Sequence, residues 1–255
     1  MKKILLIGES CIDVFKYGDC YRLNPEAPTP VLVPSKEVTN DGMAANVKHN
    51  LEFLLNQKID FVTNKEIIEK VRFVDDESNY ILLRVDNDNK IKQLTIDEIN
   101  IKIPLPLNNY DLIIVSDYNK GLISDDVLKY IIDNSKISFV DTKRVISDWA
   151  ENVTYLKINE KESVNEQHKD LLLTPKFFNK TIVTMGKYGC KLGDTIIGCD
   201  SVDVRDVAGA GDTFLSAVAS KYLMCGDIIT SMEFANKCAS YVVSQKGVTL
   251  PKCRV

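Results

Sequence analysis

Short apolar runs alternate with amphipathic stretches along this chain of 255 residues. Apolar runs bounded by polar residues are typical of buried strands, and they occur at 3–8, 111–116, 138–141, 154–158 and 181–185. Apolar residues recur at helical spacing at 44–55, 125–134, 212–224 and 227–245. Strands that alternate with amphipathic helices indicate a mostly parallel sheet covered on both faces. The pattern therefore predicts an α/β fold of three layers.

Two regions do not fit that sheet. Residues 14–38 hold β-prone pieces interrupted by Asn-Pro, Ala-Pro and Thr-Pro pairs, which suit edge strands and turns. Three further strands are predicted at 71–74, 79–86 and 91–96, with a hairpin turn at 86–89 between the last two. We expect 14–38 and 71–96 to form a small accessory β-sheet lid on a single domain that spans 1–255.

Composition and charge exclude several classes of protein. The formal net charge is −4, and lysines are interleaved with acidic residues, so no basic stripe for nucleic acid is present. No apolar run approaches the ~18–20 residues of a membrane span, and the apolar start is too short for a signal peptide. The seven cysteines are scattered without a Cys-x-x-Cys pair. We expect reduced thiols and a cytoplasmic protein that binds neither nucleic acid nor membrane.

The strongest local motif lies at 206–213, which reads Asp-Val-Ala-Gly-Ala-Gly-Asp-Thr and opens a predicted helix. Small residues at a helix N-terminus leave backbone N–H groups free to bind an anion. Asp212 would lie beside that anion hole, where it can accept a proton from a hydroxyl. A plain glycine turn with Asp212 or Thr213 as helix cap is the alternative. The chain lacks the P-loop pattern and a Gly-x-Gly-x-x-Gly after its first strand, so those nucleotide sites are not expected.

Residues 206–212 resemble the D-x-x-G-A-G-D signature of the ribokinase-like (PfkB-type) carbohydrate kinases. Residues 8–13 resemble that family's G-[DE]-x-x-x-D, residues 41–46 its G-G-x-A-x-N and residues 159–162 its N-x-x-E. Within the family, three stretches are similar to the kinase domain of D-glycero-D-manno-heptose-7-phosphate kinases, namely 22–31, 115–121 and 234–236. The resemblance covers nearly the whole chain and implies a three-layer ribokinase-like fold with a β-sheet lid.

The resemblance implies a role for each matching residue of the phosphoryl-transfer site. Asp212 matches the catalytic base, and Gly209, Ala210 and Gly211 match the anion hole for the transferred phosphoryl group. Such a hole supplies the positioning and charge stabilisation that phosphoryl transfer needs. The remaining matches concern metal ions. The resemblance implies that Asn159 and Glu162 organise Mg²⁺ and that Asp206 supports a monovalent cation. We therefore expect K⁺ to stimulate the activity. A surface helix position is the alternative for Glu162.

Further matches place substrate-binding residues. The residues that match the sugar site are Asp13, Asn46 and Gly42. The alternative for Asp13 is a plain turn residue, and the alternative for Asn46 is a helix N-terminal cap. Arg22 is a candidate ligand for a phosphate carried by the substrate, since a guanidinium group suits a phosphate bidentately, and pairing with Glu26 is its alternative. Lys143 is a further candidate ligand for a phosphate, and a solvated loop lysine is its alternative.

Weaker matches concern ATP, the implied co-substrate. A loop after a predicted strand supplies Thr184, Gly186 and Gly189, and a helix supplies Asn236 near the adenine. Lys120 follows another strand at the ligand end of the sheet, where it can meet a phosphate or remain a solvated loop lysine.

Two departures from the family pattern stand out. The strand-helix-strand unit that usually follows the first helix is missing, which removes about 35 residues relative to a typical family domain. Asp41 replaces the first Gly of G-G, and a carboxylate beside the sugar would repel a sugar phosphate or bind hydroxyl groups. If φ is positive there, Asp tolerates it better than most residues. The nucleotidyltransferase domain fused to some heptose kinases also has no counterpart in this sequence.

The resemblance implies an ATP-dependent sugar kinase that phosphorylates the anomeric hydroxyl of a heptose 7-phosphate. A kinase for another small sugar or nucleoside is one alternative, and a catalytically silent sugar- or nucleotide-binding relative is another. A lid of this size would leave an apolar face exposed, so a homodimer that covers it through paired lids is expected.

Overall fold

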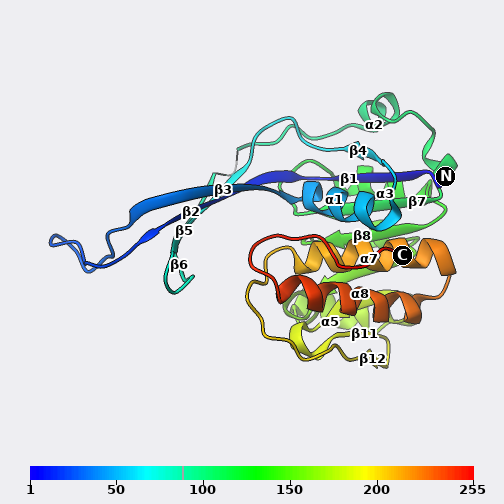
Figure 1. Ribbon diagram of the computed structural model, residues 1–255. Helices are drawn as coiled ribbons and strands as arrows, with labels where there is room; N and C mark the ends of the chain where they lie inside the picture. Colours follow the sequence, from blue (N-terminus) through cyan, green and yellow to red (C-terminus); the bar gives the residue numbers. More distant parts are fainter. Residues whose placement is uncertain (88) are drawn as a thin grey trace.

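The computed structural model describes residues 1–87 and 89–255 and shows two sheets, one inside the body and one projecting from it (Figure 1). The main sheet has eight strands in the order β12-β11-β10-β9-β8-β7-β1-β4. The strands from β10 to β4 in that order are parallel, and β11 and β12 are antiparallel. Their bounds are β1 Ile4–Gly8, β4 Asp60–Val62, β7 Leu112–Asp117, β8 Ser138–Thr142, β9 Tyr155–Asn159, β10 Thr181–Thr184, β11 Cys190–Leu192 and β12 Thr195–Ile197.

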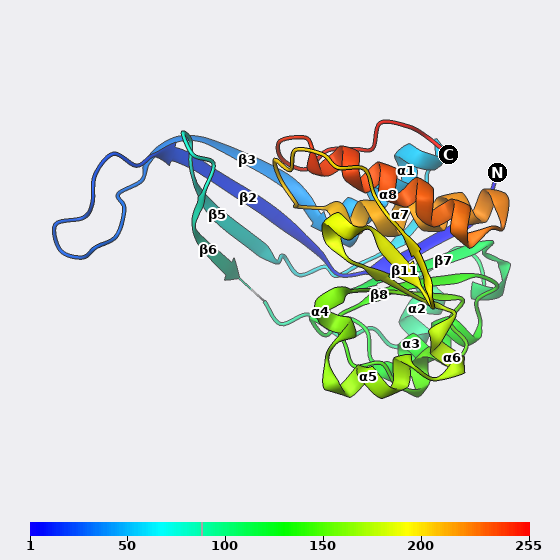
Figure 2. The same ribbon diagram turned by 90° about the horizontal axis from the view of Figure 1, so that it is seen from below.

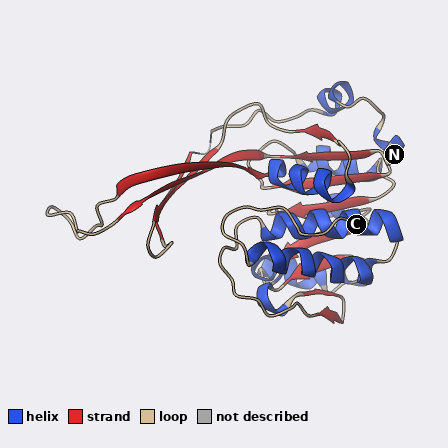
Figure 3. Cartoon of the chain, in the orientation of Figure 1, coloured by secondary structure: helices blue, strands red, loops and turns tan. Residues whose placement is uncertain are grey.

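Helices cover both faces of the main sheet (Figures 1 and 3). One face carries α1 Ala44–Leu55, α7 Ala210–Cys225 and α8 Ile228–Val243. The other face carries α2 Ile96–Lys102, α3 Asp125–Asp133, α5 Glu166–Leu172 and α6 Pro175–Phe178. Shorter elements are α4 Glu160–Ser163 and the 3₁₀ turns η1 Leu107–Asn109, η2 Asp148–Ala150 and η3 Gly186–Tyr188.

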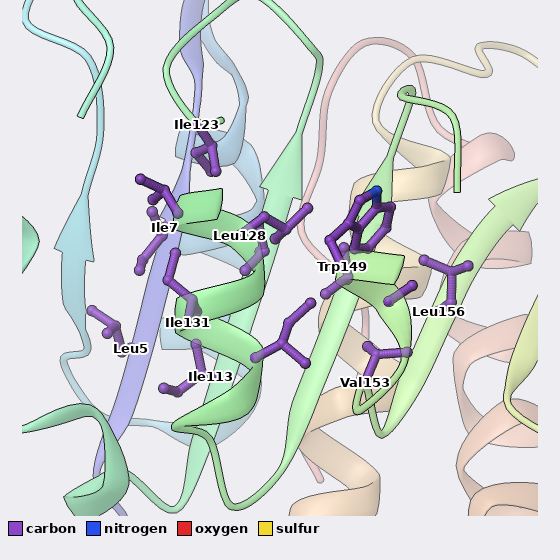
Figure 4. Packing of buried hydrophobic residues seen from close by; sticks show 14 of the residues in the cluster. Leu5, Ile7, Ile113, Ile123, Leu128, Ile131, Trp149, Val153 and Leu156 are labelled. Atoms are coloured by element: carbon purple, nitrogen blue, oxygen red, sulfur yellow. The ribbon is translucent and has the colours of Figure 1, made fainter. Parts of the chain in front are cut away.

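Strand alternation divides the core into two clusters, one on each face of the sheet. Leu5 and Ile7 of β1 point to the side of α3, whereas Ile4 and Leu6 point to the side of α1 and α7. This division follows from the strand period of two. Figure 4 shows the α3 side, where Trp149 packs beside the aliphatic residues. Strands that are apolar on both faces fit a sheet enclosed by helices.

The predicted three-layer α/β fold is confirmed, and the predicted strands and helices of the main body agree with the observed ones to within two residues at most ends. Three strands of the main sheet were not predicted from the sequence: the antiparallel β11 and β12, and β4, which pairs in parallel with β1 at the sheet edge. This strand is only Asp60-Phe61-Val62, too short to carry an alternation signal. The chain therefore returns to the main sheet between the first two strands of the second sheet, β2 and β3, and its last two, β5 and β6.

The second sheet projects from the body (Figures 1 and 2) and has the strand order β3-β2-β5-β6. Its strands are β2 Ser10–Asp19, β3 Val33–Met43, β5 Glu69–Asp75 and β6 Ile81–Asn87. The pair β2–β5 is parallel, and the other two pairs are antiparallel. The loop of residues 20–32 lies at the far end of this sheet, away from the body (Figure 2).

One expected strand of the second sheet is absent: residues 91–95 are irregular and 96 begins α2. Thr95 caps α2 by accepting from the amide of Glu98, whose side chain accepts from the amide of Thr95. This capping box was the overlooked sequence signal. The hairpin turn instead joins β5 to β6, where Asn79 has φ 57°. Of the predicted turn at 86–89, Asp88 lies outside the described residues.

Among the described residues, no helix is both long and apolar enough to cross a membrane. All seven cysteines lie in the described part of the chain and are unpaired. Burial raises the pKa of the Cys11, Cys190 and Cys238 thiols to about 12, so these three are packing residues rather than reactive thiolates.

Candidate active site

Two cavities meet at the N-terminus of α7. The first, of about 390 Å³, lies between the second sheet and the body, and we call it the sheet-side cavity. The second, of about 530 Å³, lies beyond the carboxyl ends of β8 to β10, and we call it the strand-end cavity. Four residues line both cavities: Tyr118, Lys143, Gly209 and Asp212. Carboxyl ends of parallel strands are where open α/β sheets bind ligands.

Asp212 lies in the first turn of α7 and is 7% exposed. Its Oδ2 accepts from Nδ2 of Asn46 at 2.9 Å, and its Oδ1 accepts from the hydroxyl of Tyr118 at 2.8 Å. Burial raises the pKa of Asp212 to about 6, and Asp141 adds to the increase, whereas the two hydrogen bonds and Lys157 oppose it. A carboxylate with this pKa is suited to accept a proton near neutral pH.

The backbone ahead of Asp212 is shaped for an anion. Gly209 caps α7 with φ 76°, and a Cβ there would lie 2.7 Å from Nδ2 of Asn46. Ala210 and Gly211 then start the helix, and the described residues provide no acceptor for the amides of Gly211 and Asp212. Free N–H groups at the positive end of a 16-residue helix attract negative charge.

A buried ion pair flanks this turn. Nζ of Lys157 on β9 lies 2.7 Å from Oδ2 of Asp141 on β8, and Lys157 is 6% exposed. The same ammonium lies 3.2 Å from the point where a Cβ on Gly211 would stand. Both residues line the strand-end cavity, and neither was predicted from the sequence. Each lies near the carboxyl end of a predicted strand, which is the feature of the sequence that could have indicated them.

The residues predicted for the sugar site line the sheet-side cavity. Asp13 on β2 pairs with Arg72 on β5. Gly42 lies against Asp13, because a Cβ at Gly42 would stand 2.1 Å from Oδ2 of Asp13. Asn46 is not the helix cap that was its alternative, since Met43 takes that position and Asn46 donates to Asp212. The positive φ also falls at Met43 (59°) rather than at Asp41.

Cationic side chains face the same cavity from the second sheet. Lys70, Arg72 and Arg84 line it, and Lys120 and Lys143 face it from loops of the body. Arg84 makes a bidentate pair with Asp86, and the ammonium of Lys70 lies 5.2 Å from the ring centre of Tyr118. The three residues of the second sheet were not predicted from the sequence. The pairing of β5 with β6 brings these side chains together, and the register of two paired strands cannot be read from spacing along the chain.

Asp41, the departure from the family pattern, is partnered in the structure. Its Oδ2 lies 2.7 Å from Nε2 of His49 on α1, and its side chain remains more than half exposed. Because Asp41 lines the sheet-side cavity, it adds a carboxylate acceptor to the wall of that cavity.

Asn159 lines the strand-end cavity and forms a capping box with Glu162 at the start of α4. Asn159 accepts from the amide of Glu162 at 2.9 Å, and Oε2 of Glu162 accepts from the amide of Asn159 at 2.8 Å. The other carboxylate oxygen of Glu162 lies 2.9 Å from Nζ of Lys143. No cluster of three or more acidic, His or Cys ligands occurs among the residues that the structure describes. The donor set fits Mg²⁺ held by one carboxylate, waters and phosphates.

Of the residues predicted for ATP, Lys120 lines the sheet-side cavity, and only some of the others line the strand-end cavity. Thr184, at the end of β10, and Gly186 line it. Asn236 on α8 instead donates to the carbonyls of Ile197 and Gly198, at 2.9 and 3.1 Å. Gly189 ends η3 beside that same segment, and neither Gly189 nor Asn236 lines either cavity.

Arg22 and Asp206 also lie outside the walls of both cavities. Arg22 is in the exposed loop at the far end of the second sheet and does not line either cavity. Asp206 precedes α7, and its Oδ1 accepts from the amide of Ala208 at 2.9 Å. Most of the predicted residues thus line one of the two cavities, whereas six line neither: Arg22, Glu162, Gly189, Asp206, Ala210 and Asn236.

The chain is similar in sequence to known proteins. The model for the pfkB family carbohydrate kinases matches residues 109–253, more than half of the chain. Bifunctional protein HldE from Helicobacter hepaticus is 30% identical over 96% of the chain, and that from Nitrobacter winogradskyi is 27% identical over 98%. The chain spans 61% and 62% of the lengths of these relatives.

Solved structures share the fold at lower identity. A ribokinase from Thermotoga maritima matches with a TM-score of 0.72 and 18% identity, covering 97% of this chain and 95% of that one. Phosphofructokinase-2 from Escherichia coli matches with a TM-score of 0.73 and 15% identity, covering 100% and 96%. The predicted ribokinase-like fold is therefore confirmed. By the family match and by its architecture, the chain belongs to the pfkB family of carbohydrate kinases.

Proposed function

We propose that this carbohydrate kinase transfers the γ-phosphoryl group of ATP to the anomeric hydroxyl of a heptose 7-phosphate. The observation that carries the proposal is the position of Asp212, a buried carboxylate at the junction of two cavities and in the first turn of α7. The similarity to HldE, a name shared by the relatives of Helicobacter hepaticus and Nitrobacter winogradskyi, supports the heptose as acceptor.

The transfer follows from the groups at that junction. The acceptor hydroxyl in the sheet-side cavity gives its proton to Asp212 as its oxygen attacks the γ-phosphorus. The bond between that phosphorus and the bridging oxygen of ADP breaks, and ADP leaves with the electron pair. The free amides of Gly211 and Asp212 and the ammonium of Lys157 stabilise the negative charge of the phosphoryl group in flight.

Mg²⁺ would be held beside Glu162 and Asn159, where it would neutralise charge on the phosphates of ATP. Glu162 keeps its orientation through the capping box and through Lys143. Asp206 is our candidate for support of a monovalent cation, and a phosphofructokinase-2 with this fold has been described in complex with potassium. We expect K⁺ to stimulate turnover, which replacement of K⁺ by a bulky organic cation tests.

A phosphate on the acceptor would bind at the cationic wall of the sheet-side cavity. Arg84 and Lys70 face that cavity from β6 and β5, and a phosphate would take the place of Asp86 on the guanidinium fork of Arg84. Asp13, beside Lys70 on the neighbouring strand β2, and Asn46, which donates to Asp212, would bind sugar hydroxyl groups. These placements assign the phosphate to the second sheet instead of to Arg22.

The test is ADP release from MgATP over a panel of heptose 7-phosphate, sedoheptulose 7-phosphate, fructose, ribose and adenosine. We expect the heptose 7-phosphate to give the highest kcat/KM. Arg84→Ala should raise KM for a phosphorylated acceptor at least tenfold and leave KM for MgATP unchanged, since one charge-assisted contact contributes roughly that factor. A preference for an unphosphorylated sugar or for adenosine would overturn the assignment of the acceptor.

A second copy of the chain would cover the exposed edge of the second sheet. All seven residues of β6 are exposed, and Ile81, Leu83 and Val85 are apolar. A long exposed edge strand with apolar side chains invites pairing with another chain. We therefore propose a homodimer that is joined through the second sheets.

A further inference from the structure

The carboxylate of Asp212 is held from two sides, and one of its two donors has no part in the transfer step. The Tyr118 hydroxyl donates to Oδ1 at 2.8 Å from the loop after β7, while Asn46 donates to Oδ2 from α1. Two donors on opposite oxygens fix the plane of a carboxylate. The remaining lone pairs of Asp212 are then the ones available to an acceptor hydroxyl.

Tyr118 lies where the two cavities join, because it lines both of them. The ammonium groups of Lys70 and Lys143 lie 5.2 and 5.6 Å from its ring centre. Burial and the charge of Asp212 raise the pKa of Tyr118 well above its ordinary value of 10. The phenol therefore keeps its proton and remains a hydrogen-bond donor to Asp212 at any physiological pH.

The loop that carries Tyr118 is tied to a buried carboxylate. Glu9, which directly follows β1, is fully buried and accepts from the amides of Tyr118 (2.7 Å), Lys120 (3.0 Å) and Leu122 (3.2 Å). Asn119 lies between the first two with φ 55°, and its amide donates to the side chain of the residue that ends β7. Three amides on one carboxylate hold the loop in a single conformation.

The base of that loop is fixed as well. Asp117, at the end of β7, accepts from the hydroxyl of Thr142 at 2.6 Å and from Nε of Arg144 at 2.7 Å. Arg144 also donates to the carbonyl of Ile123, just past the loop. Both ends of the loop are thus anchored to strand ends of the main sheet, and the phenol has little freedom to leave Asp212.

We propose that Tyr118 is a positioning residue of the phosphoryl-transfer site, which orients the Asp212 carboxylate through its hydroxyl, and that Glu9 fixes the loop that presents it. This inference rests on the proposed kinase function and adds two residues to its machinery. The charged and titratable groups that face Asp212 and Tyr118 from the surrounding elements are Asp141, Lys157, Lys143, Lys70 and the Cys11 thiol.

Tyr118→Phe removes the hydroxyl alone and tests the proposal. Loss of a donor to the ionised carboxylate should raise the pKa of Asp212, so the acidic limb of kcat/KM against pH should shift upward by about one pH unit. We expect kcat to fall about tenfold at pH 7, with KM for MgATP unchanged. Tyr130→Phe is the matched control, since the Tyr130 hydroxyl bonds Asn100 on the outer surface.

A second readout separates this proposal from the proposed function. The side-chain carboxyl ¹³C shift of Asp212, followed against pH, reports its ionisation whether or not the chain turns over a sugar. A higher midpoint in Tyr118→Phe than in the wild type and in Tyr130→Phe supports the proposal. Equal midpoints in all three proteins would overturn it, even if the kinase assay succeeds.

Glu9→Gln tests the anchoring part of the proposal. The amide keeps the shape of the side chain but replaces one acceptor oxygen by a donor, which opposes the amides of the loop. Hydrogen exchange at Tyr118, Lys120 and Leu122 should become at least tenfold faster, and exchange in α8 should not change. Unchanged exchange at the three amides would contradict a role for Glu9 in fixing the loop.

Discussion

Asp212 is a buried residue with an ionisable carboxyl group. Its pKa of about 6 has a clear cause, because burial and the neighbouring Asp141 disfavour the charge while Asn46, Tyr118 and Lys157 favour it. A base must be ionised to accept a proton, so the pKa sets the lower pH limit of activity.

We therefore predict that kcat/KM of the wild type falls below about pH 6, with a slope of one proton, as Asp212 becomes protonated. Initial rates of ADP release between about pH 4.5 and pH 8, at saturating MgATP, measure this limb. A rate that stays flat across the acidic part of that range would be at odds with a single buried base.

The same residue lowers the stability of the fold at neutral pH. The folded protein holds the Asp212 proton more tightly than an unfolded chain does, where the pKa is 3.8. Stability then falls as the pH rises from about 4 to about 6. We predict that Asp212→Asn raises the free energy of unfolding at pH 7 by on the order of 1–3 kcal/mol.

Part of that gain is lost, because the amide nitrogen introduced by Asp212→Asn would face either Asn46 or Tyr118, both of which donate to the native carboxylate. Urea unfolding at about pH 7 and about pH 4 measures the difference in stability between wild type and variant. The gain should shrink at the lower pH, and a variant less stable than the wild type at neutral pH would argue against the raised pKa.

At the scale of the element, the glycines that cap the two ends of α7 differ in their surroundings. Both Gly209 and Gly226 have positive φ, at 76° and 71°, but only a Cβ at Gly209 meets a neighbour, the side-chain amide of Asn46. Gly209→Ala should therefore lower kcat at least tenfold and cost about 1–2 kcal/mol of stability. Gly226→Ala should cost about 1 kcal/mol and leave kcat within twofold of the wild type.

Kinetics at neutral pH and thermal unfolding of both variants check this prediction. Equal kinetic effects at the two ends of α7 would indicate that the left-handed conformation, rather than the contact with Asn46, carries the loss. Such a result would weaken the assignment of an anion hole to the N-terminal end.

The element scale also shows what the sequence could predict. β1 and the first four residues of β7 form short apolar runs, and the apolar residues of α1 recur at helical spacing, so the main body could be predicted from pattern alone. The Asp212 motif was accessible because its residues are adjacent in the chain. By contrast, Tyr118, Lys157 and Arg84 reach the site through strand register and loop anchoring, which leave no local pattern.

Arg22 is the opposite case, a residue that the sequence indicated but that lies away from both cavities. Its surroundings in the chain resemble the family closely, but the long hairpin of β2 and β3 carries it to the far end of the second sheet (Figure 2). The length of that hairpin could not be read from a segment interrupted by prolines, because most of the prolines lie in the connecting loop rather than in the strands. The sequence pattern therefore could not show that Arg22 lies away from both cavities.

At the scale of the molecule, the second sheet stands out from the body with an uncovered edge (Figures 1 and 2). Light scattering should give a mass of twice the 28.7 kDa of the chain. Leu83→Lys should yield a monomer, because Leu83 is an exposed apolar residue in the middle of β6. Ile101→Lys is the control on α2, where a similarly exposed residue lies away from the second sheet. A monomeric wild type at micromolar concentration would rule out the dimer.

The proposed kinase activity depends on Asp212 as the base of phosphoryl transfer between the two cavities. Its most direct test is ADP release from MgATP and heptose 7-phosphate by the wild type and by Asp212→Asn. We predict that kcat falls by roughly a thousandfold or more in the variant while the affinity for MgATP stays within about twofold. Turnover by Asp212→Asn at the rate of the wild type would contradict the role of this residue as the base.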